Sequence, residues 1–144
     1  MSEHFRTPED YELFVYSLPE RFKSIRHSTL TFVRRGASLG RIAGELHLDQ
    51  QIRLVARERI LFDRLPLVID WYGYEVWRGN EKLFWYDPQP HPDDPKLRVS
   101  HPHHKHVPPD IKHNRIPAPQ MSFIRPNFPA LIEEIERLIA DSRA

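Results

Sequence analysis

The sequence predicts an α+β protein in which a short antiparallel sheet packs with helices from both ends of the chain. Apolar residues recur at helical spacing near each end, whereas residues 41–87 alternate apolar and polar residues with a period of two. Consecutive strands between terminal helices are typical of α+β folds. With 144 residues, of which 40% are hydrophobic and 28% charged, the chain can bury a core of its own. We therefore expect one domain over residues 1–144.

The N-terminal helix is predicted to begin after Thr7. Threonine can cap a helix, Pro8 suits the first helical position, and Asp10 lies three residues after the cap. Its core-facing residues follow at positions i, i+3, i+4 and i+7, namely Tyr11, Phe14, Val15 and Leu18. Pro19 should end this helix, and a second short helix is expected over residues 20–27.

About four strands are expected between residues 41 and 87, joined as a meander. Residues 41–49 and 52–62 alternate in polarity, and the second of these segments places Arg53, Arg57 and Arg59 opposite its apolar residues. Residues 67–78 and 82–87 are rich in aromatic residues and flank a glycine-first turn at residues 79–80. Because successive side chains of a strand point to opposite faces, Trp71 and Trp77 are expected on the face opposite Tyr72 and Tyr74. An exposed aromatic row on a sheet can stack nucleic-acid bases, although most such rings belong to a core.

Residues 88–126 are expected to form a long irregular loop rich in proline and histidine. Eleven of the 14 prolines fall within residues 88–129, and proline both removes a backbone donor and restricts the residue before it. A loop of this length in a compact domain usually serves a function. A final helix should start near Pro129, capped by Asn127 or Phe128. Its apolar stripe is Leu131, Ile132, Ile135, Leu138 and Ile139.

Composition excludes several classes of function. The chain has no cysteine, which rules out disulfides, thiolate nucleophiles and cysteine-ligated zinc. No apolar run approaches the ~20 residues of a membrane span, and the N-terminal stretch lacks the apolar region of a signal peptide. A cytoplasmic protein without a membrane partner is therefore expected. The formal charge is +1, but basic residues gather in segments 20–41 and 98–115, which suits local phosphate binding. A homodimer is compatible with the sequence and not required by it.

The hexapeptide HPHHKH, residues 101–106, holds four of the nine histidines. In a metal site, His103 with His104 or His106 could supply two nitrogen ligands, and His91, Asp93 or Asp94 could complete the set. The spacing matches no recognised zinc pattern, so we expect no metal and no other cofactor. A histidine-ligated, metal-dependent hydrolase stays open as an alternative.

Histidine can also cleave RNA without a metal. Attack by the 2′-hydroxyl requires a base, an acid and a cation for the phosphorane charge, and histidine can take either proton role near neutral pH. In this hypothesis His104 and His106 transfer protons, Lys105 stabilises charge, and His103 or His91 assists. Asp87 would orient one imidazole, while Tyr74 and Tyr86 would line the site. The RNA backbone would be held by four arginines, Arg53, Arg57, Arg59 and Arg98. The opposing interpretation makes HPHHKH a polar surface loop.

An ordered set of motifs runs through YGYEVW, KLFWYDPQPHPD, PHHKH, IPAPQ and LIEEIERLI. In this order the motifs resemble those of the TumE-like toxin family of bacterial type II toxin–antitoxin systems, most strongly over residues 68–140. The resemblance implies a toxin thought to act on RNA and neutralised by a cognate DNA-binding antitoxin. Pro88 departs from the asparagine that many relatives carry after the Tyr-Asp pair. The matching positions are Tyr74, Tyr86, Asp87, His91, Pro102, His103, His104, Lys105 and His106.

The sequence therefore predicts a toxin that acts as a metal-independent endoribonuclease. The alternatives are a non-catalytic module that binds RNA or protein through the same basic and aromatic face, and the metal-dependent hydrolase described above. Loss of RNA cleavage with retained folding and RNA affinity, when His104 or His106 is replaced, would separate the first two.

Overall fold

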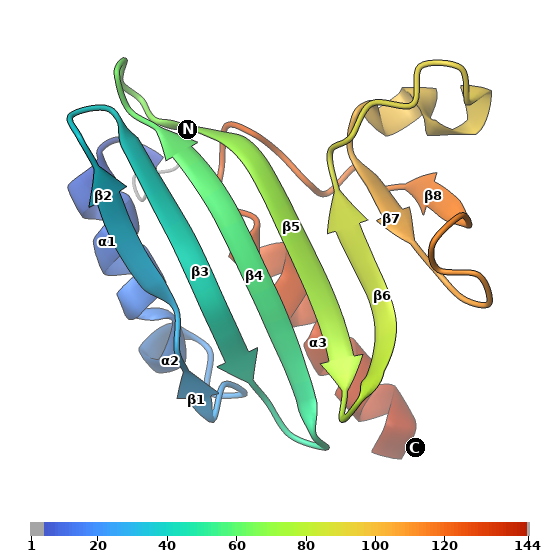
Figure 1. The fold of residues 1–144 in the computed structure, drawn as a ribbon. Helices are drawn as coiled ribbons and strands as arrows, with labels where there is room; N and C mark the ends of the chain where they lie inside the picture. Colours follow the sequence, from blue (N-terminus) through green and yellow to red (C-terminus); the bar gives the residue numbers. More distant parts are fainter. Residues whose placement is uncertain (1–4, 144) are drawn as a thin grey trace.

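An eight-stranded antiparallel sheet with helices on one of its faces is the framework of the protein in the computed structural model (Figure 1). The structure describes residues 5–143. Residues 1–4, part of the N-terminal stretch for which the sequence predicts no signal peptide, and residue 144 lie outside this range. The elements in chain order are α1 (Pro8–Tyr16), α2 (Leu18–Arg21), β1 (His27–Ser28), β2 (Thr31–Arg35), β3 (Leu39–His47), β4 (Ile52–Leu61), β5 (Val68–Arg78), β6 (Glu81–Asp87), the 3₁₀ helix η2 (Pro95–Ser100), β7 (His104–His106), β8 (Arg115–Pro117) and α3 (Phe128–Arg143).

The predicted α+β class and the meander are both confirmed. Neighbouring strands follow the order β1-β3-β4-β5-β6-β7-β8, and β2 pairs with β3 beside β1. The four expected strands are β3 to β6, which form the centre of this sheet. Four further short strands extend it, so the sheet is larger than the sequence indicates.

The expectation that residues 88–126 lack regular structure is wrong in three places. This segment contains η2, β7 and β8, and β7 pairs with β6 while β8 pairs with β7. Proline does not prevent this pairing because Pro102 and Pro108 lie outside β7, and Pro117 is the last residue of the edge strand β8. A proline at such a position withholds no donor that the ladder needs.

The two N-terminal helices differ slightly from prediction. The Thr7 hydroxyl accepts a hydrogen bond from the Asp10 backbone N–H at 3.1 Å, which confirms the predicted cap. The second helix ends at Arg21 rather than near residue 27, and Pro19 lies in its first turn. Phe22 then turns to an extended backbone conformation and packs against the core, so tertiary contact ends the helix early.

The core lies between the sheet and the three α-helices, which cover the same sheet face (Figure 1). Alternation along β4 and β5 directs one set of side chains towards the helices, including Leu54, Tyr72 and Tyr74, all fully buried. The predicted stripe of α3 faces this layer, since Leu131, Ile132, Ile135 and Ile139 are buried and Leu138 is partly buried. No helix among residues 5–143 is long and apolar enough to span a membrane.

A carboxyl group lies in this core. Glu58 of β4 is 2% exposed, and it accepts a hydrogen bond from the Tyr11 hydroxyl at 2.6 Å and another from the Tyr74 hydroxyl. Burial raises the pKa of Glu58 to about 7, although the two hydroxyl donors oppose that rise. The amide of Asn127, just before α3, donates to the Tyr74 hydroxyl at 3.0 Å. A polar network therefore joins α1, the sheet and the start of α3.

The sheet face away from the helices is called the open face below. Strand register places the side chains of paired residues on the same face. Val55 pairs with Glu75, Glu75 with Trp85, and Trp85 with His106. These residues and those two positions away in each strand share the open face. The three predicted arginines of β4 and the tryptophans of β5 and β6 belong to it, and so do three residues of β6 and β7 near the sheet edge: Arg53, Arg57, Arg59, Trp71, Trp77, Trp85, Asp87, His104 and His106.

Candidate active site

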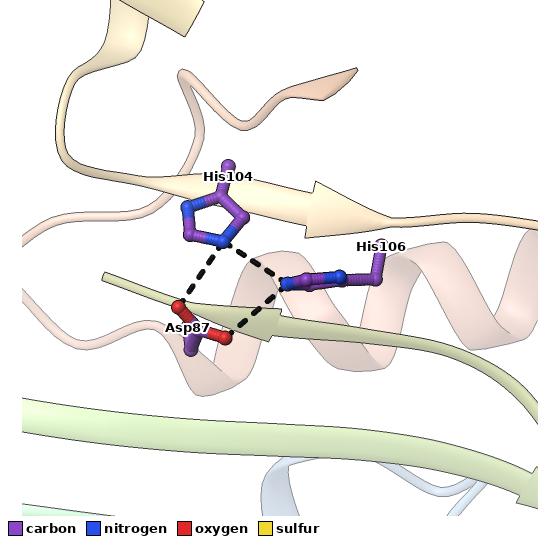
Figure 2. A group of neighbouring side chains, drawn as sticks. All are labelled: Asp87, His104 and His106. Carbon is purple, nitrogen blue, oxygen red and sulfur yellow. Dashed lines mark hydrogen bonds and ion pairs between the residues drawn. The ribbon is translucent and has the colours of Figure 1, made fainter. Parts of the chain in front are cut away.

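Asp87, His104 and His106 form a buried cluster on the open face. Asp87 is the last residue of β6, and it pairs with His104, the first residue of β7. The Nε2 atom of His104 lies 3.1 Å from Oδ1 of Asp87, and the Nε2 atom of His106 lies 3.3 Å from Oδ2. The two Nε2 atoms are 3.0 Å apart. Figure 2 shows the three side chains pointing towards one another from neighbouring strands.

Contacts around the cluster fix the orientation of each member. Nδ1 of His104 donates to the backbone carbonyl of Pro102 at 3.1 Å, which directs its Nε2 into the cluster. Oδ1 of Asp87 also accepts the backbone N–H of Gln89 at 2.8 Å. The ring of His106 stacks on Trp85 with centroids 3.6 Å apart and planes 5° apart. Nδ1 of His106 is buried and has no hydrogen-bond partner among the described residues.

Burial and charge favour an ionised carboxylate in the cluster. Asp87, His104 and His106 are 9%, 1% and 3% exposed. Burial alone would raise the pKa of Asp87, but hydrogen bonds with His104 and His106 outweigh it and hold that pKa well below its usual range. A buried anion of this kind requires a positive partner.

A hollow of about 310 Å³ adjoins the cluster on the open face. Asp87 and Trp85 form one side of it, and Arg57 and Trp71 lie on the neighbouring strands. Gly73 contributes no side chain between them, and a Cβ atom added there would meet the Trp71 ring at 3.1 Å. The remaining lining residues are Val55, Tyr74, Glu75 and Gln89. The volume lies at the small end of the range for ligand pockets.

Arg57 provides a free cation at this hollow. It is exposed, and it has no ion pair or side-chain hydrogen bond among residues 5–143. The other two predicted arginines of β4 also lie on the open face but have partners. Arg59 pairs with Asp70 at 2.5 Å, and Arg53 donates to the backbone carbonyl of Gly79 at 2.6 Å. The guanidinium of Arg53 also lies 5.1 Å from the centre of the Trp77 ring.

Three of the predicted site residues face the helices and not the cluster. Lys105 lies between the two histidines in β7, so alternation turns its side chain to the other face, where Nζ pairs with Glu134 of α3 at 2.7 Å. The Tyr86 hydroxyl donates to the same carboxylate at 2.5 Å. Tyr74 is fully buried, with its hydroxyl at Glu58. The charge-stabilising role predicted for Lys105 therefore has no support in its placement.

The remaining predicted residues lie beside the cluster or apart from it. Nδ1 of His103 is 2.7 Å from the Tyr72 hydroxyl, and burial lowers the pKa of this histidine. The ring of His91 approaches that of His104 edge-on, with centroids 4.9 Å apart. Arg98 is exposed on η2, apart from the arginines of β4.

The metal-ligand set suggested by the sequence is not formed. His103 contacts Tyr72, while Asp93 and Asp94 line a separate recess with His91. The group of potential ligands that the described residues do bring together is Asp87, His104 and His106.

Sequence reasoning did not single out Gly73 or Trp85 as parts of the site. A glycine inside a strand is a signal for close approach by another group, and Gly73 could have been found in this way. The stack of Trp85 on His106 depends on pairing between β6 and β7, which the sequence did not predict.

Glu134 should tie α3 to the strands that carry the cluster. Replacing Glu134 with alanine removes the partner of both Lys105 and the largely buried Tyr86 hydroxyl, so we expect a loss of about 1–3 kcal/mol in the free energy of unfolding. Urea denaturation followed by tryptophan fluorescence measures it. Glu133→Ala, at the exposed neighbouring position, should change stability by less than about 0.5 kcal/mol. Equal effects of the two substitutions would contradict a special role for Glu134.

Comparison with known proteins adds a family assignment. A protein-family model described as "Toxin TumE" matches residues 15–139. This range includes every strand of the described sheet and most of α3. No curated protein and no solved structure gives a significant match.

Proposed function

Since this chain belongs to the TumE toxin family, we propose that it is the toxin of a toxin–antitoxin pair and that it acts as an endoribonuclease. The family implies an antitoxin partner, and we extend this to a DNA-binding antitoxin encoded with the toxin. The substrate would be RNA in the cytoplasm. Asp87, His104 and His106 would form the reactive centre.

The observation that carries this proposal is the combination of charges and rings on the open face. A free arginine, three tryptophans and a buried Asp-His-His cluster share one surface, and a hollow there is lined by Arg57, Trp71, Trp85 and Asp87. Single-stranded nucleic acid binds through cations that follow its backbone and rings that stack on its bases. Trp71 is 41% exposed and can stack a base, while Arg57 can contact a phosphate at the same hollow.

Cleavage through the 2′-hydroxyl of RNA requires groups that the hollow and the cluster together can provide. A proton acceptor must activate the hydroxyl, a donor must protonate the leaving oxygen, and a cation must stabilise the phosphorane charge. In the metal-independent mechanism that the sequence predicts, His104 and His106 exchange these protons and Asp87 orients them. We assign the electrostatic role to Arg57 in place of Lys105, because Arg57 lines the hollow and has no internal partner.

A direct test compares the wild type with Asp87→Asn and His104→Ala in two assays. The first follows growth and total RNA integrity after induction in a bacterial host, and the second follows cleavage of a purified RNA. We expect loss of either side chain to lower the cleavage rate by roughly 10²–10⁴-fold, the usual contribution of general acid–base groups. RNA affinity and the circular dichroism spectrum should be unchanged.

A matched control uses another histidine–aspartate pair of this chain. Nδ1 of His113 lies 3.1 Å from Oδ2 of Asp110, but both side chains are exposed and lie outside the cluster. The protein with His113→Ala should cut RNA and stop growth as the wild type does. If the wild type binds RNA but never cuts it, the non-catalytic binding module replaces the endoribonuclease. If it neither binds nor cuts RNA, the open face recognises a protein.

A further inference from the structure

While Asp87 is an ionised carboxylate, protons cannot satisfy all the contacts inside the cluster. Nδ1 of His104 donates to Pro102, so Nε2 of a neutral His104 is a lone pair, and it faces Oδ1 of Asp87 at 3.1 Å. Two acceptors at this distance repel each other. If His104 is instead protonated at Nε2, it can donate to Asp87, but His106 must still be accommodated.

Each state of His106 leaves one unfavourable contact. With a lone pair on its Nε2, His106 faces the other Asp87 oxygen at 3.3 Å without a hydrogen between them. With a proton on that nitrogen, the N–H groups of His104 and His106 meet across 3.0 Å. Water does not remove the conflict, because His104 and His106 are 1% and 3% exposed. A single cation among the three groups would make all three contacts favourable.

We infer that Asp87, His104 and His106 bind one divalent transition-metal ion, that Zn²⁺ fits this ligand set best, and that the two Nε2 atoms are then ligands and no longer have the proton-transfer roles proposed above. Two imidazoles and one carboxylate are a common ligand set for catalytic zinc, which keeps a further position open for water or substrate. This ligand set differs from those that the sequence suggests, because it includes Asp87, which lies on β6 and not in the loop or β7.

The distances between ligand atoms agree with such an ion. Metal–ligand distances of about 2.1 Å place ligand atoms roughly 3.0 Å apart at right-angled coordination and roughly 3.4 Å apart at tetrahedral coordination. The two Nε2 atoms are 3.0 Å apart, Nε2 of His104 is 3.1 Å from Oδ1 of Asp87, and Nε2 of His106 is 3.3 Å from Oδ2. Each contacting pair of atoms therefore has the spacing of two ligands on one ion, with the carboxylate offering one oxygen to each imidazole.

The surroundings supply the support that metal ligands need. The Pro102 carbonyl holds His104 in the tautomer whose Nε2 is free to coordinate, and the Gln89 N–H holds the carboxylate. Trp85 fixes the ring of His106 by stacking, which makes it a positioning residue. Asp87 also lines the hollow, so an ion held by this carboxylate would lie beside the surface where substrate would bind.

The experiment measures metal binding directly, so it does not depend on RNA being the substrate. Protein without a histidine tag is treated with a chelator, freed of it, and titrated with ZnCl₂ by calorimetry and with CoCl₂ by visible absorption. The variants are Asp87→Asn, which removes the charge, and His106→Phe, which keeps a ring to stack on Trp85. His113→Ala removes an exposed histidine that could bind metal adventitiously.

We expect one Zn²⁺ per chain in the wild type and in His113→Ala, and a visible Co²⁺ spectrum in both. His106→Phe and Asp87→Asn should weaken Zn²⁺ binding by roughly 100-fold or more, beyond the usual effect of losing an outer-shell partner. Equal affinity in the wild type and His106→Phe would overturn the inference, as would loss of the bound Zn²⁺ in His113→Ala. His106→Phe decides the matter even if Asp87→Asn fails to fold.

Failure of this inference and failure of the proposed function give different results. A wild type that binds no Zn²⁺ but cuts RNA overturns the metal site and supports the metal-independent mechanism. A wild type that binds Zn²⁺ through the three residues but cuts no RNA keeps the metal site and overturns the endoribonuclease.

Discussion

Replacing Glu58 with glutamine should remove a pH-dependent loss of stability of about 3 kcal/mol. The carboxyl group has a pKa of 4.5 in its ordinary state and about 7 in the folded protein. Between these values the unfolded chain releases the proton and the folded chain keeps it. The stabilising effect of the proton is therefore fully present below pH 4.5 and is lost as the pH rises through about 7.

Glutamine imitates the protonated carboxyl group, because it presents an uncharged acceptor and donor to Tyr11 and Tyr74. Free energies of unfolding from urea denaturation should favour Glu58→Gln increasingly over the wild type as the pH rises from about 4.5 to about 7.5. His91 and His103 have lowered pKa values and act in the opposite direction, but they are present in both proteins and cancel in the difference. Parallel stability curves for the two proteins would show that Glu58 does not hold the proton.

Filling the hollow at Gly73 should abolish most RNA cleavage while leaving the sheet intact. Valine suits a strand, and its side chain would occupy the space between Arg57 and Asp87 and displace the end of the Trp71 ring. Because displacement of a substrate by about 1 Å can cost 10²-fold in rate, we expect Gly73→Val to lower cleavage by roughly 100-fold. The rate is measured on purified RNA under single-turnover conditions.

Ala43→Val is the matched control for this substitution. Ala43 pairs with Arg57, and Arg57 pairs with Gly73, so the same side chain is added to the same row of the open face but two strands away. The Ala43→Val protein should cleave RNA at the wild-type rate. Both variants should unfold at the wild-type urea midpoint, apart from the small shift that is usual for a surface substitution. A Gly73→Val protein that cuts RNA normally would show that the hollow is not the substrate site.

Local sequence patterns predicted the central sheet and the terminal helices well, since period-two and 3.6-residue patterns report directly on which face of an element is buried. They failed where the outcome depends on distant partners. β7 and β8 are three residues each, too short to show a pattern, and they exist because β6 offers an edge for pairing. The early end of α2 likewise follows from packing of Phe22 against the core.

The same distinction applies to the candidate site. Residue types alone predicted that Asp87, His104 and His106 act together, and the structure brings them within hydrogen-bonding distance. The roles of Lys105 and Tyr86 could not be predicted correctly without knowing that residues 104–106 form a strand, because a strand sends successive side chains to opposite faces. Once β7 is known, that alternation explains why Lys105 binds Glu134 on the helix side.

Because β7 and β8 are short, we expect the Asp87–His104–His106 cluster to have a lower local stability than the molecule as a whole. Two members of the cluster lie on a strand of three residues near the sheet edge, whereas β3, β4 and β5 are joined by long ladders. Segments with few contacts open with a lower free energy than the whole domain, in units that separate from the rest. We therefore expect residues 104–117 to detach and disperse the cluster while the central strands and α1 stay folded. The chain would then lose the Asp87–His104–His106 cluster reversibly without being denatured.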